Sequence, residues 1–530
     1  MQRRTWTLIT VVLGSGIVFL DSTIVNVALR AIGEQLPATV IGRLEGQSYI
    51  VNGYLLTLSA LLILAGALAD RYGRKRLFVI GLAGFGVTSL ICGLSPTMEA
   101  LVVARLAQGS FGAMLVPTAL ALINAGFEGP ARGRAFGVWA AATSALTLLG
   151  PPLGGLLVDT FGWRIAFLIN VPLVTVGVVV ALTRIDESRN PNAPRSFDWL
   201  GSVAVAVAVG GLAYGAIRGQ QEAWTDPTAW FALALGAVAT VALVPLMMYR
   251  RDPLMPPSLF ASRNFSVTNV STLLIYGAIY VQGFLSAIFF QQTLGYTALA
   301  SGLATLPMDV GLIFLSTTFG HLAGKYGPRR FMVAGPLIMG IGLAWYLRIP
   351  ADSARWAASP QDVATLLPPA DYFVDVLPAA LVFGLGLSIM VAPLTTALMT
   401  SVPVGNSGLA SAINNAISRI GPVLAGAVIF IAVSGAFYAG ISARVPEVDT
   451  TNVAVRDQLP PLNLAEEDDP AGLVQASREA STDAFRLAML IAALLCLMGA
   501  AANLAISDSV ARGEEEPLPA GPAEESRPGS

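Results

Sequence analysis

The sequence predicts an all-α integral membrane protein. Three observations support that fold class: an apolar composition, a series of long apolar segments, and an internal repeat. Of the 530 residues, 55% are hydrophobic and only 12% are charged, and the mean hydropathy is +0.68. A soluble protein carries about 25% charged residues. The composition therefore favours a chain that lies in a lipid bilayer.

Fourteen apolar segments are long enough to cross a bilayer as helices. A spanning helix needs about 20 mostly apolar residues, and backbone groups in lipid must be paired within their own segment, which favours helices. The predicted spans cover residues 6–29, 47–69, 76–95, 99–124, 136–158, 163–183, 199–217, 228–249, 268–291, 299–321, 331–348, 376–399, 408–440 and 485–507.

The distribution of Lys and Arg predicts the orientation of these helices. Basic residues collect in the loops that face the cytoplasm. With the N-terminus placed inside, most of the 31 Lys and Arg residues fall on the cytoplasmic side. An even number of spans places the C-terminus inside as well. We therefore expect a multi-pass protein of the cell membrane with both termini in the cytoplasm.

An internal repeat relates the two halves of the chain. The loop motif Gly-Ala-Leu-Ala-Asp-Arg-Tyr-Gly-Arg-Lys-Arg at 66–76 returns at 320–330 as Gly-His-Leu-Ala-Gly-Lys-Tyr-Gly-Pro-Arg-Arg. A Gly-Pro pair likewise occurs at 150–151 and again at 421–422. Both pairs match if spans 1–6 correspond to spans 9–14, which indicates a duplicated transporter.

The repeat predicts the domain organisation. Two six-helix bundles are separated by a two-helix insert. The predicted parts are an N-terminal bundle at 1–184, a cytoplasmic linker at 185–198, two inserted helices at 199–249, a second linker at 250–267, a C-terminal bundle at 268–507 with an external loop at 441–484, and a disordered cytoplasmic tail at 508–530.

The chain resembles the major facilitator superfamily, and within it the fourteen-helix drug:proton antiporters of the multidrug efflux type. Gly66–Arg76 matches that superfamily's cytoplasmic loop motif. Motifs of its helices 1, 4, 5 and 6 are matched by Leu20–Leu29, by Arg105 with Gln108 and Gly109, by Gly137 with Gly150, Pro151, Gly154 and Gly155, and by Trp163 and Arg164 with Asn170–Pro172. The resemblance implies a major-facilitator fold with two extra central helices, and export of amphipathic or cationic small molecules in exchange for protons by alternating access.

Four positions depart from the family pattern. Arg30 stands where the family usually has a proline after helix 1, and Tyr49 stands where helix 2 usually carries a tryptophan. Leu146 stands where the helix 5 motif has a glycine, and Gly324 stands where the second loop motif often has an acid. The change at Leu146 weakens the expectation of close helix packing there.

Four charged residues lie inside predicted spans and are candidates for proton coupling and substrate binding. Charges in a bilayer are costly and usually face a cavity or a partner. Asp21 and Arg105 fall at similar depths in the first bundle, so they are expected to form a pair. Asp309, a candidate cation site, and Arg419, its candidate counter-charge, occupy the second bundle. The alternative for each pair is a static structural contact.

The loop motif predicts a contact that opens and closes as the bundles move. Gly66 and Gly73 permit close approach and a tight turn. Asp70 is expected to cap a helix N-terminus or to pair with Arg74. Arg71 completes the basic cluster that holds the loop inside.

Two further motifs have alternative interpretations. In helix 5, Gly150–Gly155 predicts a close, bendable interface between the bundles. On helix 9, Tyr276, Tyr280 and Phe284 recur on one face. These rings line a path for flat substrates or face lipid.

The remaining sequence features narrow the functional classes. Two cysteines and one histidine suggest neither a disulfide framework nor a metal site, and the near-neutral net charge of −2 does not favour nucleic-acid binding. The expected partners are a small-molecule substrate, protons and the bilayer. The chain is expected to act as a monomer, with the proton gradient in place of a cofactor and without enzymatic activity. The alternatives are export of a lipid, siderophore or metabolite, or a membrane sensor or enzyme.

Overall fold

The computed structural model describes residues 3–37, 43–189, 197–221, 226–250, 252–359, 362–450, 452, 455–456, 459–465 and 472–508. Within these ranges the chain is almost entirely helical. The predicted tail beyond residue 508 lies outside the described residues, as do parts of the predicted linkers and of the external loop 441–484.

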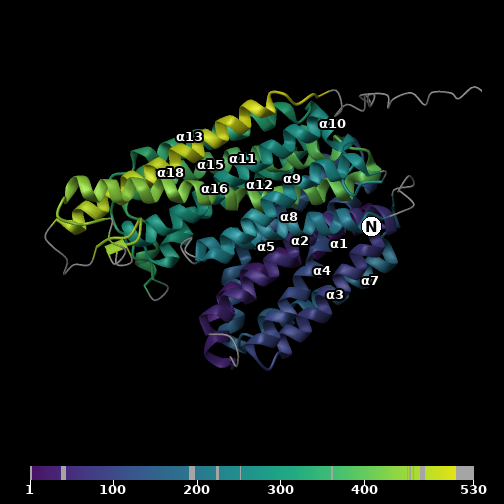
Figure 1. Ribbon diagram of the computed structural model, residues 1–530, viewed down its shortest axis with the longest axis horizontal. Helices are drawn as coiled ribbons and strands as arrows, with labels where there is room; N and C mark the ends of the chain where they lie inside the picture. Colours follow the sequence, from purple (N-terminus) through teal and green to yellow (C-terminus); the bar gives the residue numbers. More distant parts are fainter. Residues whose placement is uncertain are drawn as a thin grey trace, which may run out of the picture.

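The first half of the chain forms six long helices. In order they are α1 (Arg3–Gln35), α2 (Arg43–Tyr72), α3 (Arg74–Leu94), α4 (Met98–Gly126), α5 (Gly129–Phe161), and the short α6 (Ile165–Leu168) continued by α7 (Asn170–Arg184). They pack side by side in the lower part of Figure 1.

The second half forms a similar bundle, which lies above the first in Figure 1. Its elements are α10 (Ser258–Ala261), α11 (Arg263–Ile288) extended by a π-helical turn, α12 (Ala298–Tyr326), α13 (Arg329–Trp345), α14 (Ala370–Asp375), α15 (Leu377–Thr400), α16 (Ser407–Arg444) and α18 (Leu473–Asn503). Its core includes Phe289 stacked on Phe485, with ring centroids 4.1 Å apart.

Two helices connect the halves, α8 (Trp199–Gln221) and α9 (Pro227–Tyr249). They pack on each other, and α8 also contacts α2 and α16. Asp226 caps α9: its carboxylate accepts the backbone N–H of Thr228 and pairs with Arg218, and these two interactions hold the pKa of this carboxyl below its usual range. The inserted pair therefore lies beside the line where the first half meets α16.

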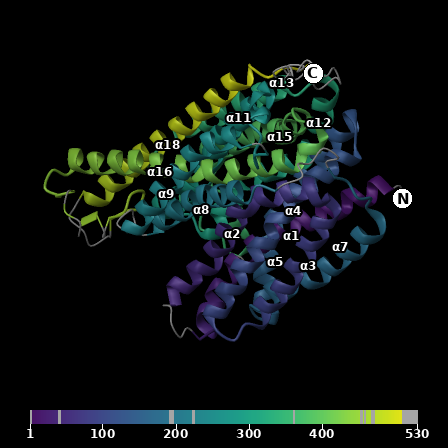
Figure 2. The ribbon, with the colours of Figure 1, turned by 45° about the vertical axis from the view of Figure 1, so that its right-hand side comes forward.

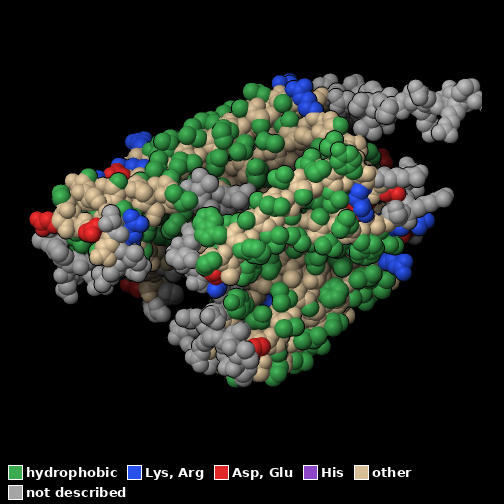
Figure 3. Space-filling model, in the orientation of Figure 1, with side chains coloured by type: hydrophobic (Ala, Val, Ile, Leu, Met, Phe, Trp, Pro, Cys, Tyr) green, Lys and Arg blue, Asp and Glu red, His purple; other side chains and the backbone are tan. Residues whose placement is uncertain are grey.

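Each of the fourteen predicted spans overlaps one of the long helices. In the described ranges, 11 helices are both long and apolar enough to cross a membrane; the other long helices are α5, α8 and α16. Large apolar side chains project from their outer faces, and charged side chains gather mainly at the two ends of the molecule (Figure 3). This distribution is that of a membrane protein.

The start of α1 and the end of α18 lie at one end of the molecule, at the right of Figure 2. We call this the motif end, because the loop motif 66–76 and its repeat 320–330 lie there, and we call the opposite end the far end. The segment between α13 and α15 lies at the far end, as does the segment between α16 and α18.

The predicted external loop 441–484 is shorter than expected, because α18 begins at Leu473 rather than near residue 485. Leu473, Ala476 and Ala480 are buried in the core of the second half. Leu459 and Leu462 are buried in the same core. These described parts of the segment are therefore packed against the bundle, which the acidic sequence of the loop did not indicate.

Candidate functional site

Asp21 lies fully buried in the first half, where three side chains from two other helices hold its carboxylate. Arg105 on α4 donates from Nη1 to Oδ2 at 2.6 Å. Gln108, one turn along α4, and Asn170, at the start of α7, donate to Oδ1 at 3.2 and 2.9 Å. The same two amides also donate to Ser89 Oγ on α3, at 3.2 and 3.0 Å. Helices α1, α4 and α7 thus meet at this carboxylate, and α3 joins them through Ser89.

Arg105 has further partners that fix its position. Its Nε donates to the carbonyl oxygen of Ile50 at 3.0 Å, and its guanidinium lies 4.1 Å from the centroid of the Tyr54 ring. Both Arg105 and Asp21 are 0% exposed. A buried ion pair is maintained only when further hydrogen bonds satisfy both charges. The predicted pairing of Asp21 with Arg105 is therefore present. Tyr54 and Ser89 were not anticipated, because an aromatic or a serine in an apolar helix gives no signal of its own.

Asp70 joins the two halves at the motif end. Its Oδ1 and Oδ2 accept the backbone N–H groups of Gly408 and Leu409, at 3.1 and 2.8 Å, in the first turn of α16. Arg74 pairs with the same carboxylate at 2.8 Å. A carboxylate at a helix N-terminus satisfies orphan donors and opposes the helix dipole. Asp70 thus takes both positions expected for it, and the helix that it caps belongs to the other half.

The contact around Asp70 is close enough to exclude side chains. A Cβ at Gly66 would lie 2.4 Å from the carbonyl oxygen of Gly408 and 2.5 Å from the Cβ of Ala412. Arg74 also donates to the carbonyl oxygens of Val404 and Gly405, the latter at 3.0 Å. These contacts close the motif end between α2 and α16.

The rest of the loop motif is fixed within the first half. Gly73 has φ of 115°, a conformation that favours glycine. The carboxylate of Glu187 accepts the backbone N–H groups of Lys75 and Arg76, each at 3.0 Å. Arg71 lies over the rings of Tyr72 and Phe197, with its guanidinium 5.3 and 5.9 Å from their centroids. Glu187 was not among the predicted residues.

A second close contact joins the halves between α5 and α12. A Cβ at Gly133 would lie 2.3 Å from the carbonyl oxygen of Gly320, and one at Gly137 would lie 2.7 Å from the Cα of Thr317. At Gly324, where the family often has an acid, a Cβ would lie 3.0 Å from the Cα of Pro130. The departure at Gly324 therefore has a steric reason, because α5 leaves little room for a side chain there.

The other glycines of the helix 5 motif pack on α1 of the same half. A Cβ at Gly150 would lie 1.8 Å from Thr23 Oγ1, and one at Gly154 would lie 3.2 Å from the Cα of Ile24. Pro151 and Gly155 belong to the same helix. The prediction that this stretch forms a close interface between the two bundles is thus wrong for Gly150 and Gly154, which contact α1 of their own bundle. Residue spacing reveals a face suited to close packing but not which helix it meets.

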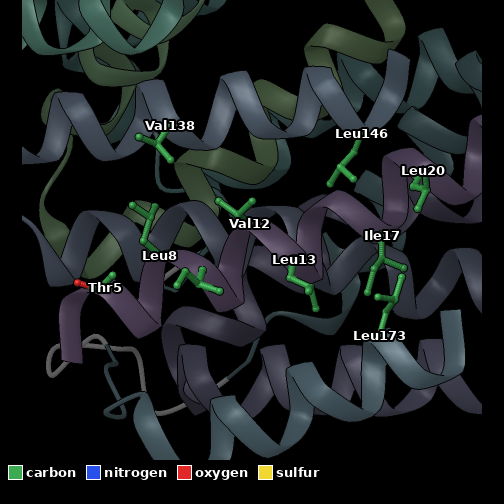
Figure 4. A pocket seen from close by; sticks show the side chains of 10 residues that line it. Thr5, Leu8, Val12, Leu13, Ile17, Leu20, Val138, Leu146 and Leu173 are labelled. Atoms are coloured by element: carbon green, nitrogen blue, oxygen red, sulfur yellow. The ribbon is translucent and has the colours of Figure 1, made fainter. Parts of the chain in front are cut away.

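Leu146 occupies a space that another glycine provides. A Cβ at Gly16 on α1 would lie 2.3 Å from Leu146 Cδ1, so the leucine fits against the bare backbone of Gly16. Leu146 also lines an apolar groove of about 340 Å³ between α1, α5 and α7, together with Leu13 and Ile17 of α1 (Figure 4). Close packing between α1 and α5 is therefore kept despite the departure.

The aromatic stripe on α11 becomes more exposed toward the far end. Tyr276 and Tyr280 are half-buried and Phe284 is exposed. The rings of Tyr280 and Phe284 stack, with centroids 5.6 Å apart. The structure does not bring these rings to the Asp21 site, so their part in substrate binding stays a prediction.

Asp309 and Arg419 do not form the expected pair. Among the described residues, neither has an ion-pair partner within 4.0 Å, and both are half-buried. Asp309 lies on α12, which packs on α5 and α15, whereas Arg419 lies on α16, which packs on α2, α4, α8, α11 and α18. Depth estimates place both near the middle of the membrane, but they do not show that the two helices pack on different neighbours.

The helical register shows which interfaces these two charges face. Asp309 lies eleven residues before Gly320, and Arg419 lies eleven residues after Gly408. Eleven residues are about three turns, so each charge shares a face with its glycine and lies about 16 Å along the helix from it. Asp309 therefore faces toward α5 and Arg419 toward α2.

The face of α12 that carries Asp309 is open toward the far end. At the motif end this face is packed against α5 at Gly320. About four and five turns from Gly320, Leu306 is 37% exposed and a Cβ at Gly302 would meet no neighbouring atom within 4 Å. Helices α5 and α12 thus meet tightly at the motif end only. Among the described residues no cluster of three metal-ligating side chains occurs.

The molecule has two repeated helical halves, and close glycine contacts seal one end of it. Buried charges lie where the halves meet at that end. These features define a secondary transporter of the rocking type. The family model of the Major Facilitator Superfamily matches residues 11–426. The chain belongs to the Major Facilitator Superfamily.

Several relatives of known name share most of the chain. The multidrug resistance protein Stp of Mycobacterium tuberculosis is 35% identical over 424 residues, which cover 80% of this chain and 74% of Stp. The tetracenomycin C resistance and export protein of Streptomyces glaucescens is 32% identical over 430 residues, 81% of this chain and 76% of that protein.

Solved transporter structures share the fold. The human organic anion transporter MFSD10 (TETRAN) superposes with a TM-score of 0.58 at 14% identity, covering 94% of this chain and 99% of that one. The proton:xylose symporter XylE superposes with a TM-score of 0.55 at 15% identity, covering 94% of each chain. At these identities the likeness supports the fold alone.

Proposed function

We propose that this protein exports amphipathic or cationic small molecules in exchange for protons, and that Asp21 carries the coupled proton. The observation that carries the proposal is the burial of Asp21 against Arg105 at the meeting point of four helices. A carboxylate inside a membrane protein is a functional group by default. Relatives named for multidrug resistance and for export support the efflux direction.

Protonation of Asp21 would act on the helix contacts around it. A neutral carboxyl holds Arg105 less strongly than a carboxylate does. Thr23, two residues further along α1, packs on Gly150 of α5, and Gly133 of the same helix closes on Gly320 of α12. A change at Asp21 therefore reaches the contact between the halves through one helix. We take this route as the link between proton binding and alternating access.

The proposal assigns the remaining parts as follows. Asp309 attracts the cationic group of the substrate, since Coulomb attraction is strong where screening is poor. The proton gradient supplies the energy without a cofactor, and a single chain in the bilayer carries out transport and no catalysis. The motif end faces the cytoplasm of the cell membrane, in agreement with its basic loops. Lipids, siderophores and metabolites are the competing substrate classes.

The test uses purified protein in proteoliposomes with an imposed pH gradient, screened with cationic dyes, lipids, siderophores and metabolites. We expect Asp21→Asn to lower the rate of uphill dye transport at least tenfold, because asparagine keeps the shape of the side chain and cannot carry the proton. Downhill exchange and expression should stay near normal. Glu128→Gln, which removes an exposed acid at the motif end, is the control. Normal uphill transport by Asp21→Asn would exclude Asp21 from the proton path, and a response to lipid or siderophore alone would reject the cationic class.

A further inference from the structure

We propose that Arg419 binds an acidic group of the transported compound, so that the substrates are zwitterionic amphiphiles rather than simple cations. The inference rests on the proposed function, because it takes the site between the halves as the place where an exported molecule binds. It adds a second charge of opposite sign to that molecule and names the residue that recognises it.

Arg419 is a half-buried cation without an acidic partner among the described residues. No acidic side chain among the described residues lies within 4.0 Å of it. The two acids that face the same region are already satisfied: Asp21 by Arg105, Gln108 and Asn170, and Asp70 by Arg74 and α16. An unpaired charge at this depth is expensive. A partner supplied by a bound molecule removes that cost.

The position of Arg419 places it between the halves and away from lipid. It shares a helix face with Gly408 and Ala412, which pack on Gly66 of α2. It lies about 16 Å nearer the far end than Gly408. The helix that it faces, α2, also carries Tyr54, whose ring supports Arg105. A guanidinium at this position is well suited to a carboxylate, which it binds with two parallel hydrogen bonds.

Asp309 presents the opposite charge from another wall. It faces toward α5 at a similar distance from the motif end, and the face of α12 beside it is open toward the far end at Leu306 and Gly302. Because α12 and α16 pack on different helices, the two charges belong to separate walls of the second half. A molecule that engages both must therefore carry a cation and an anion at separate positions.

Two dyes that differ only in the acidic group test this inference. Rhodamine B is zwitterionic, and its ethyl ester keeps the same cationic ring system without the carboxylate. We expect the purified wild-type protein to bind rhodamine B about tenfold more tightly than the ester by fluorescence anisotropy, a difference of about 1.4 kcal/mol. Arg419→Gln should bind both dyes with the affinity of the ester, and Arg419→Lys should keep most of the preference.

Two further variants and a transport assay separate the outcomes. Arg444→Gln removes an arginine from the far end of the same helix, where it pairs with Glu479 and Asp483, and should leave the preference unchanged. Asp309→Asn should weaken both dyes alike, because both carry the cation. Three results would each overturn the inference. The wild type could bind the two dyes with equal affinity, the preference for rhodamine B could survive Arg419→Gln, or rhodamine B could show no saturable binding. A preference without pH-driven accumulation of either dye would instead reject proton-coupled export and leave the anion site in place.

Discussion

Replacement of Asp70 by asparagine should open the motif end without disturbing the fold. The carboxylate accepts N–H groups from Gly408 and Leu409 in the other half and pairs with Arg74 in its own half. Asparagine has nearly the same shape but offers one oxygen. Its NH₂ group would face a backbone N–H of α16. One of the two hydrogen bonds that the carboxylate accepts from the other half would then be replaced by two donors facing each other.

The size of the effect follows from the bonds that cross between the halves. A hydrogen bond to a charged group contributes about 1.5–3 kcal/mol, against about 1 kcal/mol for a neutral one. Losing one charged bond and weakening the other costs the closed motif end about 3 kcal/mol, or roughly 150-fold in the equilibrium. A preference of 99:1 for closure would fall to roughly 2:3. The pair with Arg74 remains within the first half in both states and does not enter this difference.

Pulsed electron paramagnetic resonance measures this equilibrium directly. Spin labels at Glu128, which caps α5, and at Arg330, on α13, report the separation of the halves at the motif end, since both side chains are exposed. The buried Cys92 and Cys496 are replaced by serine. We expect Asp70→Asn to add a long-distance population. Glu187→Gln removes a carboxylate that binds only its own half and should add none. An unchanged distribution in Asp70→Asn would refute the role of this contact in closure.

Two further predictions concern the glycine contacts of α5. Gly150→Ala places a methyl group 1.8 Å from Thr23 Oγ1 and should lower the stability of the detergent-purified protein by about 1–3 kcal/mol, measured by thermal unfolding. Gly435→Ala, which has open space around its Cβ, should be neutral; equal effects would mean that helix propensity and not packing decides. Gly133→Val meets the backbone of Gly320 at 2.3 Å and should raise the long-distance population in the spin-label experiment, and a fully closed motif end in this variant would contradict the packing argument.

Much of the fold was accessible from the sequence because the bilayer constrains it. Length and hydropathy alone located all fourteen long helices, since backbone groups in lipid leave few other structures. The error at the start of α18 has a physical cause: Leu473–Ala484 is polar enough to resemble a loop, yet Leu473, Ala476 and Ala480 form a buried helical face. Hydropathy averaged over a window does not register a face.

The sequence predicted how deep each charged residue lies in the membrane, but not which neighbouring helix it faces. The rise per residue placed Asp21 and Arg105 at one level, and they pair because α1 and α4 are neighbours. The same reasoning placed Asp309 and Arg419 at one level, but their helices pack elsewhere. Asn170 and Glu187, which complete the Asp21 site and the loop motif, could only be assigned once the partner helices were known.

Helix α5 contacts both α1 in its own half and α12 in the other half. Gly150 lies against α1 beside Asp21, and Gly137, about 20 Å along the same helix, lies against α12 of the other half. At the second contact backbone meets backbone, so it has no flexible side chain to absorb a displacement. A movement of α1 of even a few tenths of an ångström must shift α5 as a unit or break a contact. In the proposed mechanism, packing along α5 therefore links Asp21 to the contact between α5 and α12, and the stretch of α5 between Gly137 and Gly150 carries no charged side chain.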